Sequence, residues 1–251
     1  MSISTLPVAQ GRNFDPLELY AAAIDTSDYA ARVVPVVRRL VPEIGVLLDV
    51  GAGGGQLGAA LQDRRSGWSA IEPSPTMRAR LERLHSPPRI VPCGWEAADV
   101  APAAHDTVLA ATMPALFEHP EVFLARCQAW ARRTVVWVVP AHPGPRGLCF
   151  AGCLQSRWHG EDETPGIDIV LRGRSPDLRP QAIAFTDWTF SGVVRDLGAL
   201  SAYLCDRLGW PKTDGRRFEL AAHLAAQAQP DAAGLRLNIP RKSAVFVWGK
   251  S

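Results

Sequence analysis

Apolar runs alternate with helix-like segments between residues 45 and 140. One intervening segment begins with Ser74 and Pro75, a good N-cap and a good first helical residue, and carries Met77, Leu81 and Leu84 on one face. Strand–helix alternation at this pace predicts an α/β fold with a doubly wound, mostly parallel sheet. The strands expected within this core are residues 46–50, 68–72, 89–93, 107–112 and 134–139.

The pattern changes on both sides of this core. Upstream, residues 15–44 predict two short helices, with Pro35 starting or kinking the second. Downstream of Pro140, residues 141–190 are rich in Gly, Pro, Arg and Trp and have no clean period, which indicates an insertion or lid on the substrate side.

The last third of the chain completes the expected fold. Two helical stretches, 192–210 and 216–229, follow the insertion, and residues 235–250 predict two strands with a basic turn, an antiparallel closing hairpin. We therefore expect residues 1–251 to form one domain with a seven-stranded sheet. Its parts are N-terminal helices (15–44), a cofactor-binding core (45–140), an insertion with helices (141–234) and the hairpin (235–250).

Composition narrows the possible partners. The net charge is +2 and the arginines are scattered, so the basic stripe typical of nucleic-acid binding is not apparent. Five cysteines, an odd number, fit a reducing compartment better than a disulfide framework. The chain has no apparent signal peptide and no apolar stretch long enough to span a bilayer. We expect a soluble, cytoplasmic protein without nucleic-acid or membrane partners.

A glycine-rich loop follows the first strand and matches two sequence motifs of nucleotide-binding loops. Gly53, Gly55 and Gly58 match the dinucleotide-binding fingerprint, whereas Asp49 followed by glycines at alternate positions, beginning at Gly51, does not belong to that fingerprint. A carboxylate at the end of a buried strand is unfavourable unless it meets a cation or hydrogen-bond donors, and it would repel a pyrophosphate. Asp49 therefore favours a ligand with an ammonium group.

A second acid, Glu72, closes the second strand. It lies 21 residues after Gly51, where a carboxylate can accept hydrogen bonds from both hydroxyls of a ribose. This feature fits NAD and S-adenosylmethionine equally, so it supports a nucleoside-containing ligand without choosing between them.

Together these residues resemble the class I S-adenosylmethionine-dependent methyltransferases. The resemblance covers roughly residues 30–140 and the C-terminus, and the closing hairpin fits the antiparallel seventh strand typical of that fold. The motifs that carry it are the residues from Asp49 to Gly55, the segment Glu72-Pro73-Ser74, and the residues from His105 to Leu109.

The resemblance implies a role for each matching position. Asp49 and the loop residues Gly51, Ala52, Gly53 and Gly55 would hold the amino-acid end of S-adenosylmethionine. Glu72 would bind the ribose. The positions expected near the adenine and near the reactive end of the cofactor are Pro73, Gly94 and Trp95, and Thr112 and Met113, respectively.

Histidines and cysteines after the fifth strand offer other chemistry. His142 and His159 are the candidates for a catalytic base, should the acceptor have to lose a proton. With Cys149 and Cys153 they could also supply zinc ligands, but their spacing matches no compact zinc motif, so we expect no metal.

The function that we expect is methyl transfer from S-adenosylmethionine to a small-molecule acceptor. Near-neutral charge and the aromatic residues Trp158, Phe185, Trp188 and Phe190 of the insertion favour such an acceptor. Two alternatives stay open at this point. One is an NAD(P)-dependent oxidoreductase that uses the same glycine loop, and the other is a non-catalytic, cofactor-binding member of the fold. The acceptor atom and the oligomeric state are open as well.

Overall fold

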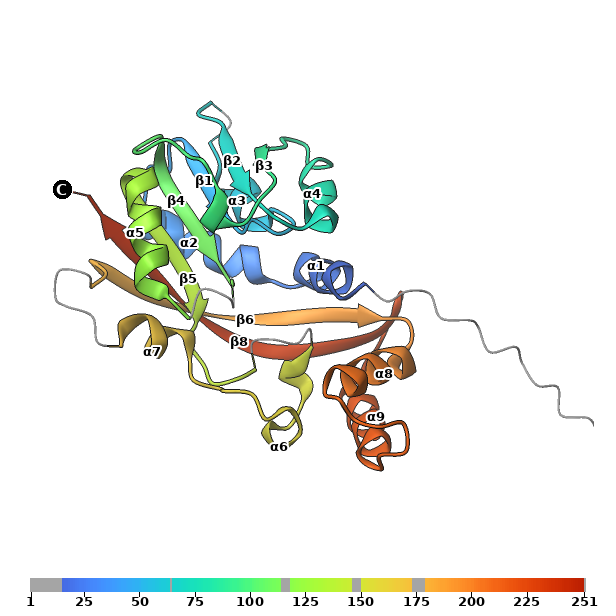
Figure 1. Cartoon of the computed structure of the whole chain (residues 1–251). Coiled ribbons are helices and arrows are strands. Elements are labelled where there is room, and N and C mark those ends of the chain that lie inside the picture. Colours follow the sequence, from blue (N-terminus) through green and yellow to red (C-terminus); the bar gives the residue numbers. More distant parts are fainter. Residues whose placement is uncertain (1–14, 64, 114–117, 146–149, 173–178, 251) are drawn as a thin grey trace, which may run out of the picture.

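The chain forms an eight-stranded mixed sheet with helices on both faces (Figure 1). The computed structural model describes residues 15–63, 65–113, 118–145, 150–172 and 179–250. The strands are β1 (Leu47–Val50), β2 (Trp68–Ile71), β3 (Arg89–Val91), β4 (His105–Ala111), β5 (Ala131–Pro140), β6 (Ala182–Val194), β7 (Gln229–Asp231) and β8 (Gly234–Gly249).

The first five strands are parallel, as the sequence predicts. The strand order is β3-β2-β1-β4-β5-β8-β6, with β7 paired to β8, and β8 runs antiparallel to its neighbours β5 and β6. The prediction of a mostly parallel, doubly wound sheet with a terminal antiparallel hairpin is confirmed, with eight strands in place of seven.

Two apolar cores lie on opposite faces of the sheet. Neighbouring residues such as Leu47 and Leu48 point to different cores because side chains alternate along a strand. The helices α1 (Pro16–Thr26), α2 (Tyr29–Leu40), α3 (Gln56–Leu61), α4 (Pro75–Leu81), α8 (Leu197–Arg207) and α9 (Arg216–Gln227) contribute to one core, and α5 (Pro120–Trp130) and α7 (Gly166–Leu171) to the other.

The helix start predicted at Ser74 is observed, whereas the one at Pro35 is not. Ser74 accepts a hydrogen bond from the Met77 backbone N–H, and α4 begins at Pro75. Pro35 lies inside α2, so it does not start that helix, and the alternative that it kinks the helix stays a prediction.

The insertion differs from its prediction because it contains the long strand β6. Both faces of β6 carry apolar residues, since Ile183 and Phe185 are exposed while Trp188 and Phe190 are buried. The sequence therefore does not show the alternation of apolar and polar residues that is typical of a strand. The predicted helix at 192–210 is correspondingly shorter, because β6 continues to Val194 and α8 begins after its N-cap.

The terminal hairpin also has different bounds. Residues 235–250 do not form two strands with a basic turn, because β8 is one continuous strand and its hairpin partner is β7. The basic pair Arg241 and Lys242 lies within β8, opposite Trp188 and Asp187 of β6. The backbone of these two residues is paired with β6, so they continue the strand and do not form a turn.

The β6–β8 pair projects past the end of the parallel strands (Figure 1). The pairing of β5 with β8 stops at Pro140 and Ser243, whereas β8 continues in contact with β6 back to Leu235. This overhang extends beyond the carboxyl edge of the sheet, and α8 and α9 lie at its far end (Figure 1). No helix within the described ranges is long and apolar enough to cross a membrane.

Candidate functional site

The glycine loop lies at the point where the chain reverses direction across the sheet. From β1 the chain proceeds outward through β2 to β3, and it then returns to β4 on the other side of β1. In open α/β sheets, ligands bind outside the carboxyl ends of the strands at this point. The candidate site is built from the residues that follow β1, β2 and β4.

Asp49 is buried on β1 with few donors to stabilise its charge. The residue is 3% exposed. Burial, together with the nearby charge of Glu72, raises the pKa of Asp49 to about 7, against a smaller lowering effect of the Gly58 backbone N–H. A buried carboxylate with one backbone donor and an acidic neighbour has an incomplete environment that a cationic group would complete.

Glu72 is held by the backbone of both adjacent loops. Its Oε2 accepts a hydrogen bond from the Gly53 N–H at 2.8 Å, and its Oε1 accepts one from the Ser74 N–H, also at 2.8 Å. The residue is 6% exposed. Because a carboxylate oxygen has two lone pairs, these bonds orient Glu72 and leave capacity for further donors.

The glycines of the loop differ in what a side chain at each position would contact. A Cβ added to Gly53 would meet nothing within 4 Å, so this residue borders open space. At Gly51 a Cβ would overlap the Met113 thioether, at Gly55 it would meet Leu81, and at Gly58 it would meet both Trp68 and Asp49. Packing thus accounts for Gly55 and Gly58, while Gly53 is the position at which a ligand can approach the backbone.

The end of β4 joins the loop through Thr112 and Met113. Thr112 has a φ of 56°, which is unfavourable for a β-branched residue. The Tyr29 hydroxyl lies 2.8 Å from Thr112 Oγ1, and burial raises the Tyr29 pKa, with Asp49 a smaller contributor. Tyr29 is a site residue that no sequence pattern indicated, since its contact with Thr112 spans 83 positions and leaves no local signal.

The N-terminal helix α1 is tied to the loop and to α4. Gln56, the first residue of α3, donates a hydrogen bond to Asp25 at 2.5 Å. Arg80 of α4 pairs with Glu18 at 3.2 Å and also with Asp25. These polar contacts hold α1 beside the glycine loop and next to β6, with which α1 packs extensively.

The residues predicted near an adenine lie along the same carboxyl edge of the sheet. Pro73 is exposed after β2, and Gly94 and Trp95 follow β3. The Trp95 ring packs edge-on against Phe123, with ring centroids 5.2 Å apart, and remains partly exposed. One edge of this indole is thus fixed by the core.

His142 lies beyond the carboxyl end of β5 and makes hydrogen bonds through both ring nitrogens. A guanidinium can only donate, so at 3.0 Å from Arg241 Nη1 the His142 Nε2 is an acceptor. Nδ1 lies 3.0 Å from the Lys242 carbonyl and 3.1 Å from the Lys242 backbone nitrogen, and in this tautomer its N–H donates to the carbonyl. Burial lowers the pKa of His142, an effect that Arg241 reinforces. The ring is therefore neutral, and its basic nitrogen is already engaged.

His159 lies apart from this edge, on the short helix α6 (Ser156–His159). Its Nδ1 accepts a hydrogen bond from the Glu161 N–H at 3.1 Å, and its Nε2 lies 3.0 Å from Glu163 Oε1. The adjacent Trp158 packs edge-on against Trp210 and His223. The structure therefore places the two candidate bases in different surroundings.

The possible metal ligands are only partly described. Cys149 lies outside the described residues, and Cys153 is buried, which raises the pKa of its thiol to about 12. Within the described ranges, no three His, Cys, Asp or Glu side chains are grouped so that they could hold a metal ion.

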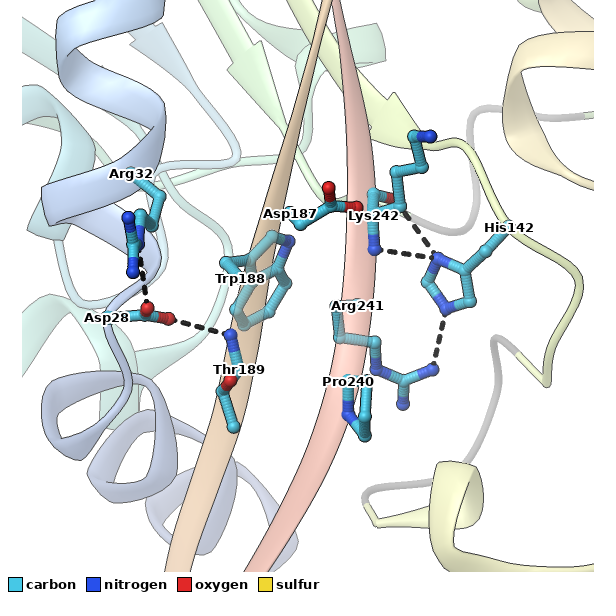
Figure 2. Close-up of a pocket in the computed structure, with 9 residues that line it drawn as sticks. All are labelled: Asp28, Arg32, His142, Asp187, Trp188, Thr189, Pro240, Arg241 and Lys242. Atoms are coloured by element: carbon cyan, nitrogen blue, oxygen red, sulfur yellow. Dashed lines mark hydrogen bonds and ion pairs between the residues drawn. The ribbon is translucent and has the colours of Figure 1, made fainter.

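A hollow of about 420 Å³ opens where the β6–β8 overhang leaves the sheet (Figure 2). Trp188 of β6 packs against Tyr29 with ring centroids 4.5 Å apart, so the hollow lies next to the Tyr29–Thr112 contact at the end of β4. Of the aromatics expected in a substrate pocket, Trp188 lines this hollow, Phe190 is buried beside it, and Phe185 is exposed. The lining residues are Asp28, Arg32, His142, Asp187, Trp188, Thr189, Pro240, Arg241 and Lys242.

Comparison with solved structures finds similar folds. The "putative type II methyltransferase" from Anaeromyxobacter dehalogenans has a TM-score of 0.55 and 16% identity, with 88% of this chain and 95% of that chain covered. The "putative methyltransferase" from Bacillus halodurans has a TM-score of 0.51 and 12% identity, with coverage of 87% and 98%. No family model and no curated protein matches the sequence.

These likenesses extend over nearly the whole length of both solved structures. The chain therefore has the Rossmann-like fold found in methyltransferase structures, as the resemblance of its motifs implies. At these identities the comparison establishes the fold, and the chemistry of the site has to be argued from the site itself.

Proposed function

We propose that this protein transfers a methyl group from S-adenosylmethionine to a small-molecule acceptor. The observation that carries the proposal is the buried Asp49 carboxylate at the reversal point of the sheet, with its pKa raised to about 7 and an acidic neighbour. Of the ligands that bind such loops, one with an ammonium group relieves both the burial of Asp49 and its repulsion from Glu72.

The described residues fit the parts of this cofactor. Asp49 would hold the ammonium group, and the open space at Gly53 lets the amino-acid end approach the backbone. Glu72, already oriented by two backbone N–H groups, would accept hydrogen bonds from the ribose hydroxyls. Ala52 and Gly55 would support this cradle through the turn in which the Gly55 N–H donates to the Ala52 carbonyl.

Two further groups of residues would contact the ends of the cofactor. Pro73, Gly94 and Trp95 would border the adenine, with the Trp95 ring held on one edge by the core. Thr112 and Met113 would lie at the reactive end. Because the Met113 thioether packs on Gly51, a ligand placed against Gly51 requires Met113 to change rotamer, which its unbranched side chain allows.

The chain would promote the reaction by binding and orienting the reactants. The sulfonium of S-adenosylmethionine supplies an activated methyl group, so the residues around it mainly need to align an acceptor atom with it and exclude water. Helix α1 and the β6–β8 overhang border the carboxyl edge and would shield it. We assign no histidine base, because the basic nitrogen of His142 accepts from Arg241, and Nδ1 of His159 accepts from the Glu161 N–H. Alanine substitution of His159 should therefore leave turnover close to that of the wild type, including for an acceptor that loses a proton.

Isothermal titration with S-adenosylmethionine, S-adenosylhomocysteine and NADH tests the proposal. We expect the two sulfur ligands to bind and NADH not to bind. Binding of NADH alone would contradict the proposal and favour an oxidoreductase that uses Gly53, Gly55 and Gly58. Incubation with methyl-labelled S-adenosylmethionine and a panel of small molecules then separates an enzyme from a protein that only binds the cofactor, which would label none of them.

A further inference from the structure

We propose that Arg241 binds a carboxylate of the acceptor, so that the hollow beside the cofactor site selects acidic small molecules. The inference rests on the proposed function for the identity of the ligand as an acceptor. The anion site itself is argued from the geometry around Arg241.

Arg241 is a shielded cation without an acidic partner among the described residues. Its side chain extends from β8 beside Cys153 and Tyr20, and burial lowers its pKa. The side chain that it contacts by a hydrogen bond is His142, which is neutral, and no described carboxylate lies within ion-pair distance of the guanidinium. Because shielding a charge from water is unfavourable unless it is paired, this guanidinium favours an incoming anion.

The guanidinium is also fixed in direction. His142 accepts from Nη1 and is itself anchored on the Lys242 backbone (Figure 2). On another side, a Cβ added to Gly152 would overlap Nη2, so the arginine packs directly on that backbone. A planar fork held in this way is preorganised for two parallel hydrogen bonds to a carboxylate.

The charges around the hollow favour an anion with a single charge. The residues that line it include three basic ones, Arg32, Arg241 and Lys242, and two acidic ones, Asp28 and Asp187, so their formal charges sum to one positive charge when His142 is neutral. Arg32 is paired with Asp28 at 3.0 Å. Lys242 and its cross-strand neighbour Asp187 point to the other face of the β6–β8 pair, where Lys242 Nζ lies 5.5 Å from the Phe185 ring centroid. Arg241 therefore supplies the excess charge, which suits a monocarboxylate better than a phosphate dianion.

The position of the hollow links it to the reactive end of the cofactor site. Arg241 is the register partner of Trp188, Trp188 packs on Tyr29, and Tyr29 reaches Thr112 at the end of β4. Because Trp188 and Tyr29 are buried, one layer of side chains lies between the hollow and Thr112, and an acceptor whose carboxylate is bound by Arg241 would pass beside these two rings to reach the end of β4.

The test uses benzoate, benzamide and phenyl phosphate as probes, titrated calorimetrically into the full-length protein. We expect benzoate to bind at least about tenfold more tightly than the isosteric but neutral benzamide, and R241Q to lose about that factor for benzoate only. The variant R241K keeps the charge without the fork and should retain part of the preference. R39Q removes an exposed arginine of α2 as a matched control and should bind as the wild type does.

Three results would overturn the assignment. They are equal binding of benzoate and benzamide to the wild type, unchanged benzoate binding by R241Q, and tighter binding of phenyl phosphate than of benzoate. Circular dichroism of each variant shows whether R241Q is folded, and titration with S-adenosylhomocysteine separates the two proposals. Carboxylate binding without S-adenosylhomocysteine binding would contradict the proposed function alone, and the reverse would contradict this inference alone.

Discussion

Among single residues, Asp49 is the one on which the proposed ligand depends most. In the free protein the pKa of this carboxyl group is about 7, so it keeps its proton up to that pH, whereas in the unfolded chain it would release the proton near its usual pKa of 3.8. Raising the pH between these values therefore favours the unfolded state. A cationic ligand reverses the balance, because it binds to the ionised carboxylate.

Cofactor binding should consequently depend on pH. Below a pH of about 7, the affinity for S-adenosylhomocysteine should fall by up to about tenfold per pH unit, since binding must first remove the proton of Asp49. Calorimetry in buffers of different ionisation enthalpy should detect proton release at acidic pH and almost none at about pH 8.5. A flat profile, or proton uptake, would contradict the raised pKa of Asp49.

The substitution Asp49→Asn should separate stability from binding. Asparagine can still accept the Gly58 N–H but has no charge, so the free protein should be as stable as the wild type or more stable at neutral pH. The affinity for the cofactor should fall by about 30-fold or more, because the ammonium loses its counter-charge. Urea unfolding and titration measure the two effects, and a variant that binds normally would show that Asp49 does not contact the cation.

Gly53 and Gly55 allow a matched comparison of ligand contact with packing. Both have positive φ, so alanine strains both by about 1 kcal/mol. Gly55→Ala should lose about 1–3 kcal/mol more in the free energy of unfolding, because its Cβ would press on Leu81 and Leu84. Gly53→Ala should show the larger loss of cofactor affinity. The opposite ranking in titration would place the ligand away from Gly53.

At the scale of elements, the contact between Tyr29 and Thr112 joins α2 to the end of β4. Tyr29 also packs on Trp188 of β6, so three elements meet at one phenol. We therefore expect the contact with α2 to stabilise the unfavourable backbone conformation of Thr112, which has a φ of 56°.

A double-mutant cycle tests this dependence. Tyr29→Phe and Thr112→Val should each lower the free energy of unfolding by about 1 kcal/mol, since each leaves a polar partner unsatisfied. The double variant should be less destabilised than the sum, with a coupling of about 1 kcal/mol. Additive effects in urea unfolding would mean that the 2.8 Å contact contributes nothing to stability.

In the molecule as a whole, the proposed site lies at the carboxyl edge of the sheet, whereas a second hollow lies at the amino edge. That hollow is lined by Arg38, Gly45, Arg65 and Arg133, among others.

Hydrogen exchange should show which of the two edges binds the cofactor. S-adenosylhomocysteine should slow exchange in α1 and in the loop at Gly53, and leave the amino edge unchanged. Protection at the amino edge alone would move the cofactor site there.

Local signals were sufficient for the parallel core. Short apolar runs, a Ser-Pro helix start and glycines after the first strand act over a few residues, so the order and type of these elements could be predicted. Asp49 and Glu72 were also recognisable, because an acid at the end of a buried strand is unfavourable unless a ligand or a donor meets it. The β6 strand was not, since its apolar residues occupy both faces.

A Rossmann-like sheet with two acids and a glycine-rich loop at its carboxyl edge could therefore be predicted from the sequence. The contact of Tyr29 with Thr112, the packing of Met113 on Gly51, and the bond from Arg241 to His142 across 99 positions became visible only in the folded chain. Strand patterns and turns depend on neighbours in the chain. The partners of a buried polar group are set by whatever the packed sheet brings beside it.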